Sequence, residues 1–119
     1  MVQDNLTAQT ENRNGVLVVH VSGPLGFDSY YRFKELMDPL MEAPGVRIVL
    51  DAENLGYVNS KGFVLLARYQ RTAGQQGSFF GIAALSSRLV KEVALLGLDR
   101  LVKTYATVEE AVAAAESGR

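Results

Sequence analysis

The spacing of apolar residues alternates along the chain between patterns typical of strands and of helices. Val16–Val21 and Val46–Asp51 are short, β-branched runs, and the second has the near-continuous apolar character of a strand covered on both faces. Between them, Tyr30, Phe33 and Met37 recur at helical spacing. The pattern predicts elements in the order β β α β α β α β α, at residues 6–11, 16–21, 30–41, 46–51, 60–73, 78–83, 87–96, 101–105 and 108–115.

Turn and cap residues sharpen this order. Asn14-Gly15 favours a tight turn, so the first two strands are predicted to form a hairpin. Pro39 predicts a kink or an early end of the first helix near Asp38. Residues 52–59 are predicted to be a loop whose apolar residues pack back onto the core. Strands that alternate with helices after a hairpin indicate an α/β fold, with a mixed, mostly parallel sheet of about five strands and four helices.

Length and charge limit the protein classes to consider. With 119 residues and 48% hydrophobic content, the chain is predicted to form one domain over residues 1–119. Its 13 acidic and 12 basic residues nearly cancel, which argues against direct nucleic-acid binding. From Ser60 to Lys103, however, seven Lys or Arg residues accompany two acids. This excess fits either a docking face for an acidic partner or ordinary solvated helix faces.

The residue inventory argues against metal or cofactor chemistry. The chain has no cysteine, and His20 is its one histidine, so we interpret His20 as a strand residue at a sheet face and expect neither cofactor nor metal. Residues 1–7 lack a basic region followed by an apolar one. No apolar run approaches the roughly 20 residues that span a bilayer. We therefore expect a cytoplasmic protein with no membrane insertion.

The enzyme classes with recognisable motifs do not fit the sequence. Ser60 follows a predicted strand, but a nucleophile elbow needs glycine two positions earlier, where Val58 stands. The chain also lacks a Gly-rich phosphate-binding loop and a His-Glu-x-x-His zinc motif. The sequence therefore predicts a protein that is not an enzyme.

Ser60 at the predicted helix start has two interpretations from its chemistry. Its hydroxyl can cap the helix by accepting a hydrogen bond from a first-turn amide. Alternatively, it can carry a phosphate, which the unpaired N–H groups and dipole of the helix start would favour, with Lys61 adding a positive charge. The residues themselves leave both interpretations open.

The stretch Val49–Gly62 resembles the signature of STAS domains, the anti-sigma factor antagonists. In that signature a strand ending in Asp leads through a loop to Asp-Ser-Ser/Thr-Gly at the start of a helix. Gly23–Leu25 is similar to the loop after the second strand of the family. Leu95–Leu101, Tyr105 and Thr107–Ala111 are similar to its C-terminal pattern. The likeness extends along nearly the whole chain.

The resemblance implies partner switching. The unphosphorylated domain would bind an anti-sigma factor that is also a serine kinase, phosphorylation would release it, and a serine phosphatase would restore it. Ser60 would be the phosphoacceptor, and Gly62 would let the partner's backbone come close. The implied partner-binding residues are Phe27, Asp28, Asn59, Ser60, Lys61 and Gly62.

Three positions depart from the family pattern. Asn59 stands where an acid normally precedes the phosphoserine, Gly26 stands where an acid often follows Gly-x-Leu, and Lys61 replaces a second hydroxyl residue. Two other functions remain open besides the phosphorylation switch. One is a constitutive STAS subunit of a membrane transporter assembly, which contacts an ATPase without a phosphate cycle. The other is a sensor domain for a small ligand or nucleotide.

Overall fold

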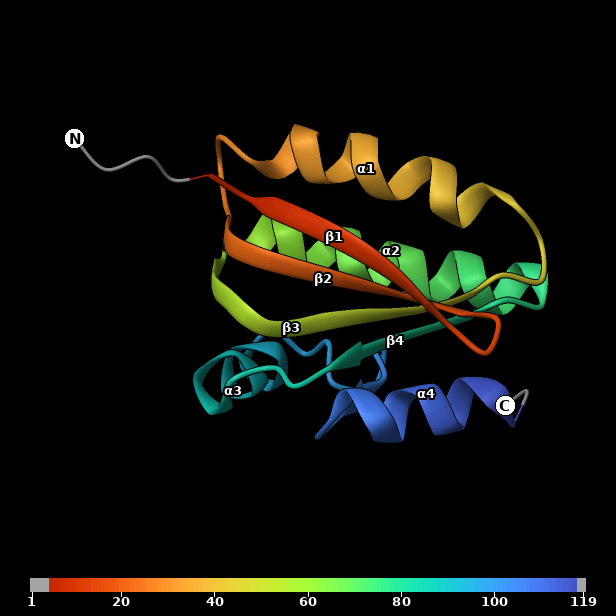
Figure 1. Cartoon of the computed structure of the whole chain (residues 1–119). Helices are drawn as coiled ribbons and strands as arrows, with labels where there is room; N and C mark the ends of the chain where they lie inside the picture. The colour runs from red at the N-terminus through yellow and green to blue at the C-terminus, as the bar shows by residue number, and fades with distance from the viewer. Residues whose placement is uncertain (1–4, 118–119) are drawn as a thin grey trace.

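The computed structural model describes residues 5–117, which form five strands and four helices in the predicted order (Figure 1). The five strands make one sheet in the order β1-β2-β3-β4-β5, antiparallel between β1 and β2 and parallel elsewhere. The predicted α/β class, mixed sheet and N-terminal hairpin are therefore confirmed. The elements are β1 (Thr7–Arg13), β2 (Val16–Leu25), α1 (Tyr30–Glu42), β3 (Arg47–Val58), α2 (Ser60–Gln76), β4 (Phe79–Ala83), α3 (Ser87–Leu95), β5 (Thr104–Tyr105) and α4 (Val108–Glu116).

The hairpin forms at the predicted Asn-Gly turn. Asn14 and Gly15 both have positive φ, 54° and 85°, the combination that matches the twist of the flanking strands. The side chain of Asn12 accepts a hydrogen bond from the Gly15 amide at 3.0 Å. The turn sets Arg13 opposite Val16 and so fixes the register of the whole hairpin.

The sheet lies between two helical layers, with α1 and α2 on one face and α4 on the other (Figure 1). Side chains alternate between the faces along β3. Ile48 and Leu50 join the larger core with residues of α1, α2 and α3, whereas Val49 joins a smaller core under α4. Burial on both faces explains the continuous apolar run in the sequence of this strand.

Strand β3 is much longer than the sequence predicted. It continues past Asp51 to Val58, because residues 54–58 pair with Ser22–Leu25 of β2 after a register shift. The prediction of a loop over residues 52–59 is therefore wrong. Leu55 and Val58 are buried as expected, but Tyr57 is 50% exposed. The end of this strand is set by its long-range pairing with β2. The pattern of apolar residues within the strand carries no information about that pairing.

Further boundaries differ from the prediction. Strand β2 continues to Leu25, so its expected end at Val21 and the loop expected from Ser22 are wrong, because residues 22–25 pair with β3. Helix α1 runs through Pro39 to Glu42, so the early end is wrong. Met37 and Met41 on its buried face hold the last turns against the core. Strand β5 is confined to two residues, which pair with Ile82 and Ala83 of β4. Within residues 5–117, no helix is long and apolar enough to cross a membrane.

Candidate functional site

The ends of β2 and β3 bring two loops together at one edge of the sheet. Leu25 lies opposite Val58 in the parallel ladder, and the amide of Asn59 donates to the carbonyl oxygen of Leu25 at 3.0 Å. The segment after Leu25 and the start of α2 are therefore neighbours. This edge, at the carboxyl ends of parallel strands, is where α/β folds usually meet ligands and partners.

Asn59 caps α2, and Ser60 does not. Asn59 has an extended backbone, φ −84° and ψ 173°, and its Oδ1 accepts a hydrogen bond from the Gly62 amide at 2.8 Å. The interpretation of Ser60 as the capping residue is thus wrong. Ser60 is the first residue with helical geometry, one position too late for its hydroxyl to occupy the cap.

The Ser60 hydroxyl is left available by this arrangement. The residue is exposed, and its side chain makes no hydrogen bond to any part of the chain that the structure describes. The first-turn amides of Ser60 and Lys61 point out of the helix start, where helices leave N–H groups without intrahelical acceptors. Exposed hydroxyl, outward amides and the positive end of the helix dipole thus coincide at one position.

Lys61 extends toward α1 instead of lying over Ser60. Its Nζ lies 4.4 Å from the ring centroid of Tyr30 and 4.8 Å from that of Tyr31. It also donates a hydrogen bond to the Tyr31 hydroxyl at 3.1 Å. These contacts fix the ammonium beside the first turn of α1, where it adds positive charge to the rim of the site.

Gly62 is a packing residue rather than an exposed one. It is buried, and a Cβ at this position would lie 3.0 Å from Leu25 Cγ and 3.0 Å from Val58 Cγ1. The absence of a side chain lets the first turn of α2 sit on the ends of β2 and β3. The sequence explained this glycine by a close approach of the partner, but the contacts within the chain already account for it.

Phe27 and Asp28 lie on the neighbouring loop, as the sequence predicted. Both are exposed, and the Phe27 side chain is 89% exposed. Buried Ser29 holds the loop, since its Oγ donates to the carbonyl oxygen of Pro24 at 2.7 Å and accepts from the Gly26 amide at 3.0 Å. A fixed loop with an almost fully exposed phenylalanine is typical of a recognition surface.

An apolar hollow beside Ser60 was missed by the sequence reasoning. Its volume is about 340 Å³, and Tyr57, Leu95 and Leu96 line it together with Ser60. Leu95 is 85% exposed and Leu96 47% exposed. Two adjacent leucines at the end of a short predicted helix cannot both face the core, which could have indicated a binding surface. Only the tertiary structure brings them next to β3.

Helix α3 is tied to the end of β3 by one side chain. Arg88 Nη2 donates to the carbonyl oxygen of Gly56 at 2.6 Å, and Arg88 Nη1 lies 3.6 Å from Glu92. This tie holds the exposed leucines of α3 beside Tyr57. The surface around Ser60 is therefore formed jointly by the end of β3, the start of α2 and the end of α3.

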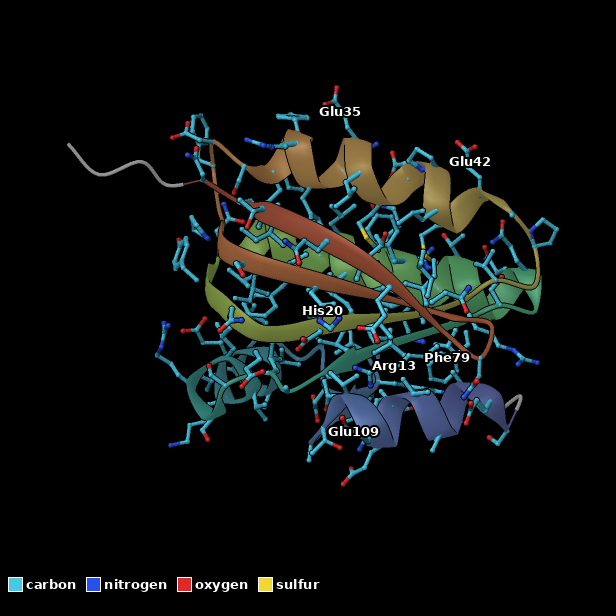
Figure 2. The ribbon with its side chains drawn as sticks, viewed as in Figure 1. Arg13, His20, Glu35, Glu42, Phe79 and Glu109 are labelled. Carbon is cyan, nitrogen blue, oxygen red and sulfur yellow. The ribbon has the colours of Figure 1, made fainter. Side chains whose placement is uncertain are left out.

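A separate polar cluster lies on the α4 side of the sheet. His20 Nδ1 is 2.7 Å from Asp51 and its Nε2 is 2.7 Å from Glu11, whose carboxylate also accepts from Arg13 Nε at 2.6 Å. Hydrogen bonds to Glu11 and Asp51 raise the pKa of His20. Figure 2 shows Arg13 and His20 on the sheet side of α4, with Glu109 on that helix. His20 is a strand residue as expected, but its carboxylate partners come from β1 and β3 and were not foreseen.

Comparison with known proteins agrees with this architecture. Residues 7–111 match the family model of the STAS domain, and the chain belongs to that family. The anti-sigma-F factor antagonist RsfB of Mycobacterium tuberculosis is 24% identical over 116 residues, covering 98% of this chain and 94% of that protein.

Two solved structures extend the comparison. An anti-sigma factor antagonist from Mycobacterium paratuberculosis superposes with a TM-score of 0.83, at 25% identity, covering 97% of each chain. The anti-sigma factor antagonist SpoIIAA in its unphosphorylated form has a TM-score of 0.74 at 19% identity, covering 93% of this chain and 97% of that one. The chain therefore spans nearly the full length of these relatives.

Proposed function

We propose that this protein is an anti-sigma factor antagonist that binds an anti-sigma factor through the surface around Ser60. The relatives that bear this name match the chain over almost its whole length. The observation that carries the proposal is the exposed, unbonded Ser60 hydroxyl beside the apolar surface of Tyr57, Leu95 and Leu96. Exposed apolar side chains around a few polar groups, here Asn59, Ser60 and Glu92, suit a protein–protein interface.

The proposal includes a switch by phosphorylation of Ser60. The anti-sigma factor would act as the serine kinase, and a serine phosphatase would reverse the reaction. A phosphoserine adds close to two negative charges and would meet the free amides at the start of α2, so the fold tolerates it. A partner that covers the same surface would have to desolvate that dianion, which opposes binding.

Asn59 is compatible with such a switch. Its Oδ1 performs the capping function that an Asp would also perform at this position. The missing charge therefore changes the electrostatic field around Ser60 but not the backbone that presents it. Phe27 and Asp28 complete the proposed surface, with Lys61 on its rim and Gly62 beneath it.

The first prediction is that Ser60→Asp weakens binding to the cognate anti-sigma factor by at least about tenfold. The melting temperature should be unchanged or slightly higher, because a negative charge is favourable at a helix start. Calorimetric titration and thermal unfolding measure the two effects. Ser60→Ala should bind like the wild type, since it adds no charge.

Ser87→Asp is the matched control. Ser87 is also exposed and is also the first residue of a helix that the preceding residue caps. If Ser87→Asp lowered affinity as much as Ser60→Asp, the effect would not be specific to the proposed site. Phosphosite mapping of the protein from its own cells provides the complementary test. Unmodified Ser60 under both growth and stress conditions would contradict the switch and favour constitutive binding.

A further inference from the structure

A second groove lies farther along α2, between this helix and the segment that follows α3. Its volume is about 380 Å³. The side chain of Gln70 joins its two walls by accepting a hydrogen bond from the Lys103 amide at 2.9 Å. We call it the arginine groove, and its lining residues are Val64, Ala67, Arg68, Gln70, Arg71, Leu98, Arg100 and Leu101.

The groove carries positive charge that the chain itself does not pair. Arg68, Arg71 and Arg100 line it, and none of them forms an ion pair with another residue in the range 5–117. No carboxylate lines the groove, since the neighbouring Asp99 is not among the lining residues. Arg68 also interacts electrostatically with Asp38, so Arg71 and Arg100 are the guanidinium groups that most favour a ligand supplying carboxylates or phosphates.

The backbone favours carboxylates over a phosphate. Phosphate sites in proteins commonly rely on free backbone N–H groups. Here the amides of Leu101 and Val102 donate to the carbonyl oxygen of Leu98, and that of Lys103 donates to Gln70. A phosphate would therefore lack these amides as donors, whereas a carboxylate can be bound in a bidentate fashion by an arginine side chain alone.

Apolar contact surface lies beside the charges. Val64 is 51% exposed and Leu101 55% exposed, and both line the groove. A ligand that fits therefore carries an apolar side chain next to its carboxylates. A segment of protein with Asp or Glu on either side of a Leu-like residue has this chemistry.

The arginine groove is continuous with the surface around Ser60. Ser60, Val64, Ala67 and Arg71 are spaced by four, three and four residues, so they share one face of α2. A protein that covers Ser60 is thereby positioned to reach the groove. A separate small ligand would not need this alignment.

We propose that the arginine groove binds an acidic segment, with a central apolar residue, of the protein partner that covers Ser60. The identification of that partner as the anti-sigma factor rests on the proposed function, whereas the chemistry of the groove does not. The groove anchors one end of the interface, and the Ser60 surface provides the part that phosphorylation would control.

The first test uses a probe that does not depend on the partner. A synthetic peptide of repeated Glu-Leu-Asp is titrated into the ¹⁵N-labelled chain, with a Gln-Leu-Asn peptide as control. We expect the acidic peptide at millimolar concentration to shift the amide signals of Val64, Arg71 and Leu101, and Arg71→Glu to abolish the shifts. Absence of shifts, or equal shifts with the neutral peptide, would overturn the proposal. Stronger, competing shifts with ATP would also overturn it, in favour of a nucleotide site.

The second test uses the anti-sigma factor. Arg71→Glu and Arg100→Glu should each weaken binding by about tenfold and reduce its dependence on salt. Arg47→Glu makes the same charge change at an exposed position outside the groove and should stay within about twofold of the wild type. Equal binding by all three variants would overturn the groove proposal alone. If Ser60→Asp lost binding while Arg71→Glu bound normally, the function proposed for the Ser60 surface would stand and the groove proposal would be overturned.

A crosslink identifies the bound segment directly. Because the chain has no cysteine, Leu101→Cys offers a unique attachment point for a photoreactive benzophenone. Crosslinks to an acidic segment of the partner are expected. Crosslinks to a basic segment, or to a second copy of this chain, would overturn the proposal.

Discussion

Asn59 caps helix α2, and Ser60 presents a free hydroxyl next to it. A single residue could not do both. Asn59 satisfies a first-turn amide of α2, and the Ser60 hydroxyl consequently stays free of any bond to the described chain. A serine engaged as a cap would have to rearrange that hydrogen bond when its hydroxyl was phosphorylated or contacted by a partner. Placing the cap one residue earlier makes changes at Ser60 nearly independent of helix stability.

We predict that Asn59→Ala lowers the free energy of unfolding by about 1 kcal/mol, because a capping hydrogen bond is lost. Asn59→Asp should be as stable as the wild type or more stable by a few tenths of a kcal/mol, since a carboxylate both caps and complements the dipole. Chemical denaturation of the three proteins measures the difference. Equal stability of the alanine variant would contradict the role of Asn59 as a cap.

Helix α2 connects the site to the core, and two of its glycines have opposite environments. Gly62 is pressed against Leu25 and Val58, whereas a Cβ on Gly74 would meet no atom within 4 Å. Both lie inside the same helix, so their intrinsic helix propensities are comparable. Packing alone therefore separates the two positions.

We accordingly predict opposite effects of the same substitution at the two positions. Gly74→Ala should stabilise the protein by about 0.5–1 kcal/mol through helix propensity. Gly62→Ala should destabilise it by about 1–3 kcal/mol, because the added methyl group forces Leu25 and Val58 to move. Thermal and chemical denaturation of both variants provide the comparison. Stabilisation by Gly62→Ala would show that the end of β2 yields more easily than its packing indicates.

For the whole molecule, the charged cluster joins four elements, β1, β2, β3 and α4. Glu11, Arg13, His20 and Asp51 come from three strands, and Arg13 also lies 3.7 Å from Glu109 of α4. Hydrogen bonds from Arg13 and His20 lower the pKa of Glu11 to about 2. The N-terminal hairpin is thus held to the centre of the sheet by electrostatic contacts as well as by its ladder.

This cluster predicts how stability depends on pH. The folded-state pKa of His20 is raised above its ordinary value of 6.5, so the stabilisation from its charge is fully present below pH 6.5. It should be lost as the pH rises through the raised pKa. The melting temperature of the wild type should therefore fall between pH 6 and pH 9, and that of His20→Gln should change much less.

The interpretation of that experiment is simplified by composition. His20 is the one histidine and the chain has no cysteine, so no other side chain ordinarily titrates near neutral pH. A melting temperature that rose with pH in the wild type, or a variant with the same pH profile, would contradict the assignment.

The sequence by itself determined those features that depend on local chemistry. Apolar periodicity fixed the order of the elements, and Asn14-Gly15 fixed the hairpin. The position of Ser60 at the start of a helix also followed from residues next to it. Each of these depends on backbone preferences and spacings within a few residues.

The tertiary structure alone decided what depends on residues far apart in the chain. Strand β3 extends to Val58 because β2 pairs with it, and this pairing brings Phe27 to the same edge as Ser60. The hollow beside Ser60 needs Tyr57 from β3 and Leu95 from α3, and the arginine groove needs α2 and the segment after α3. Such surfaces depend on which distant segments of the chain come together. Burial of apolar side chains between elements decides this, and the residue pattern within a single element does not.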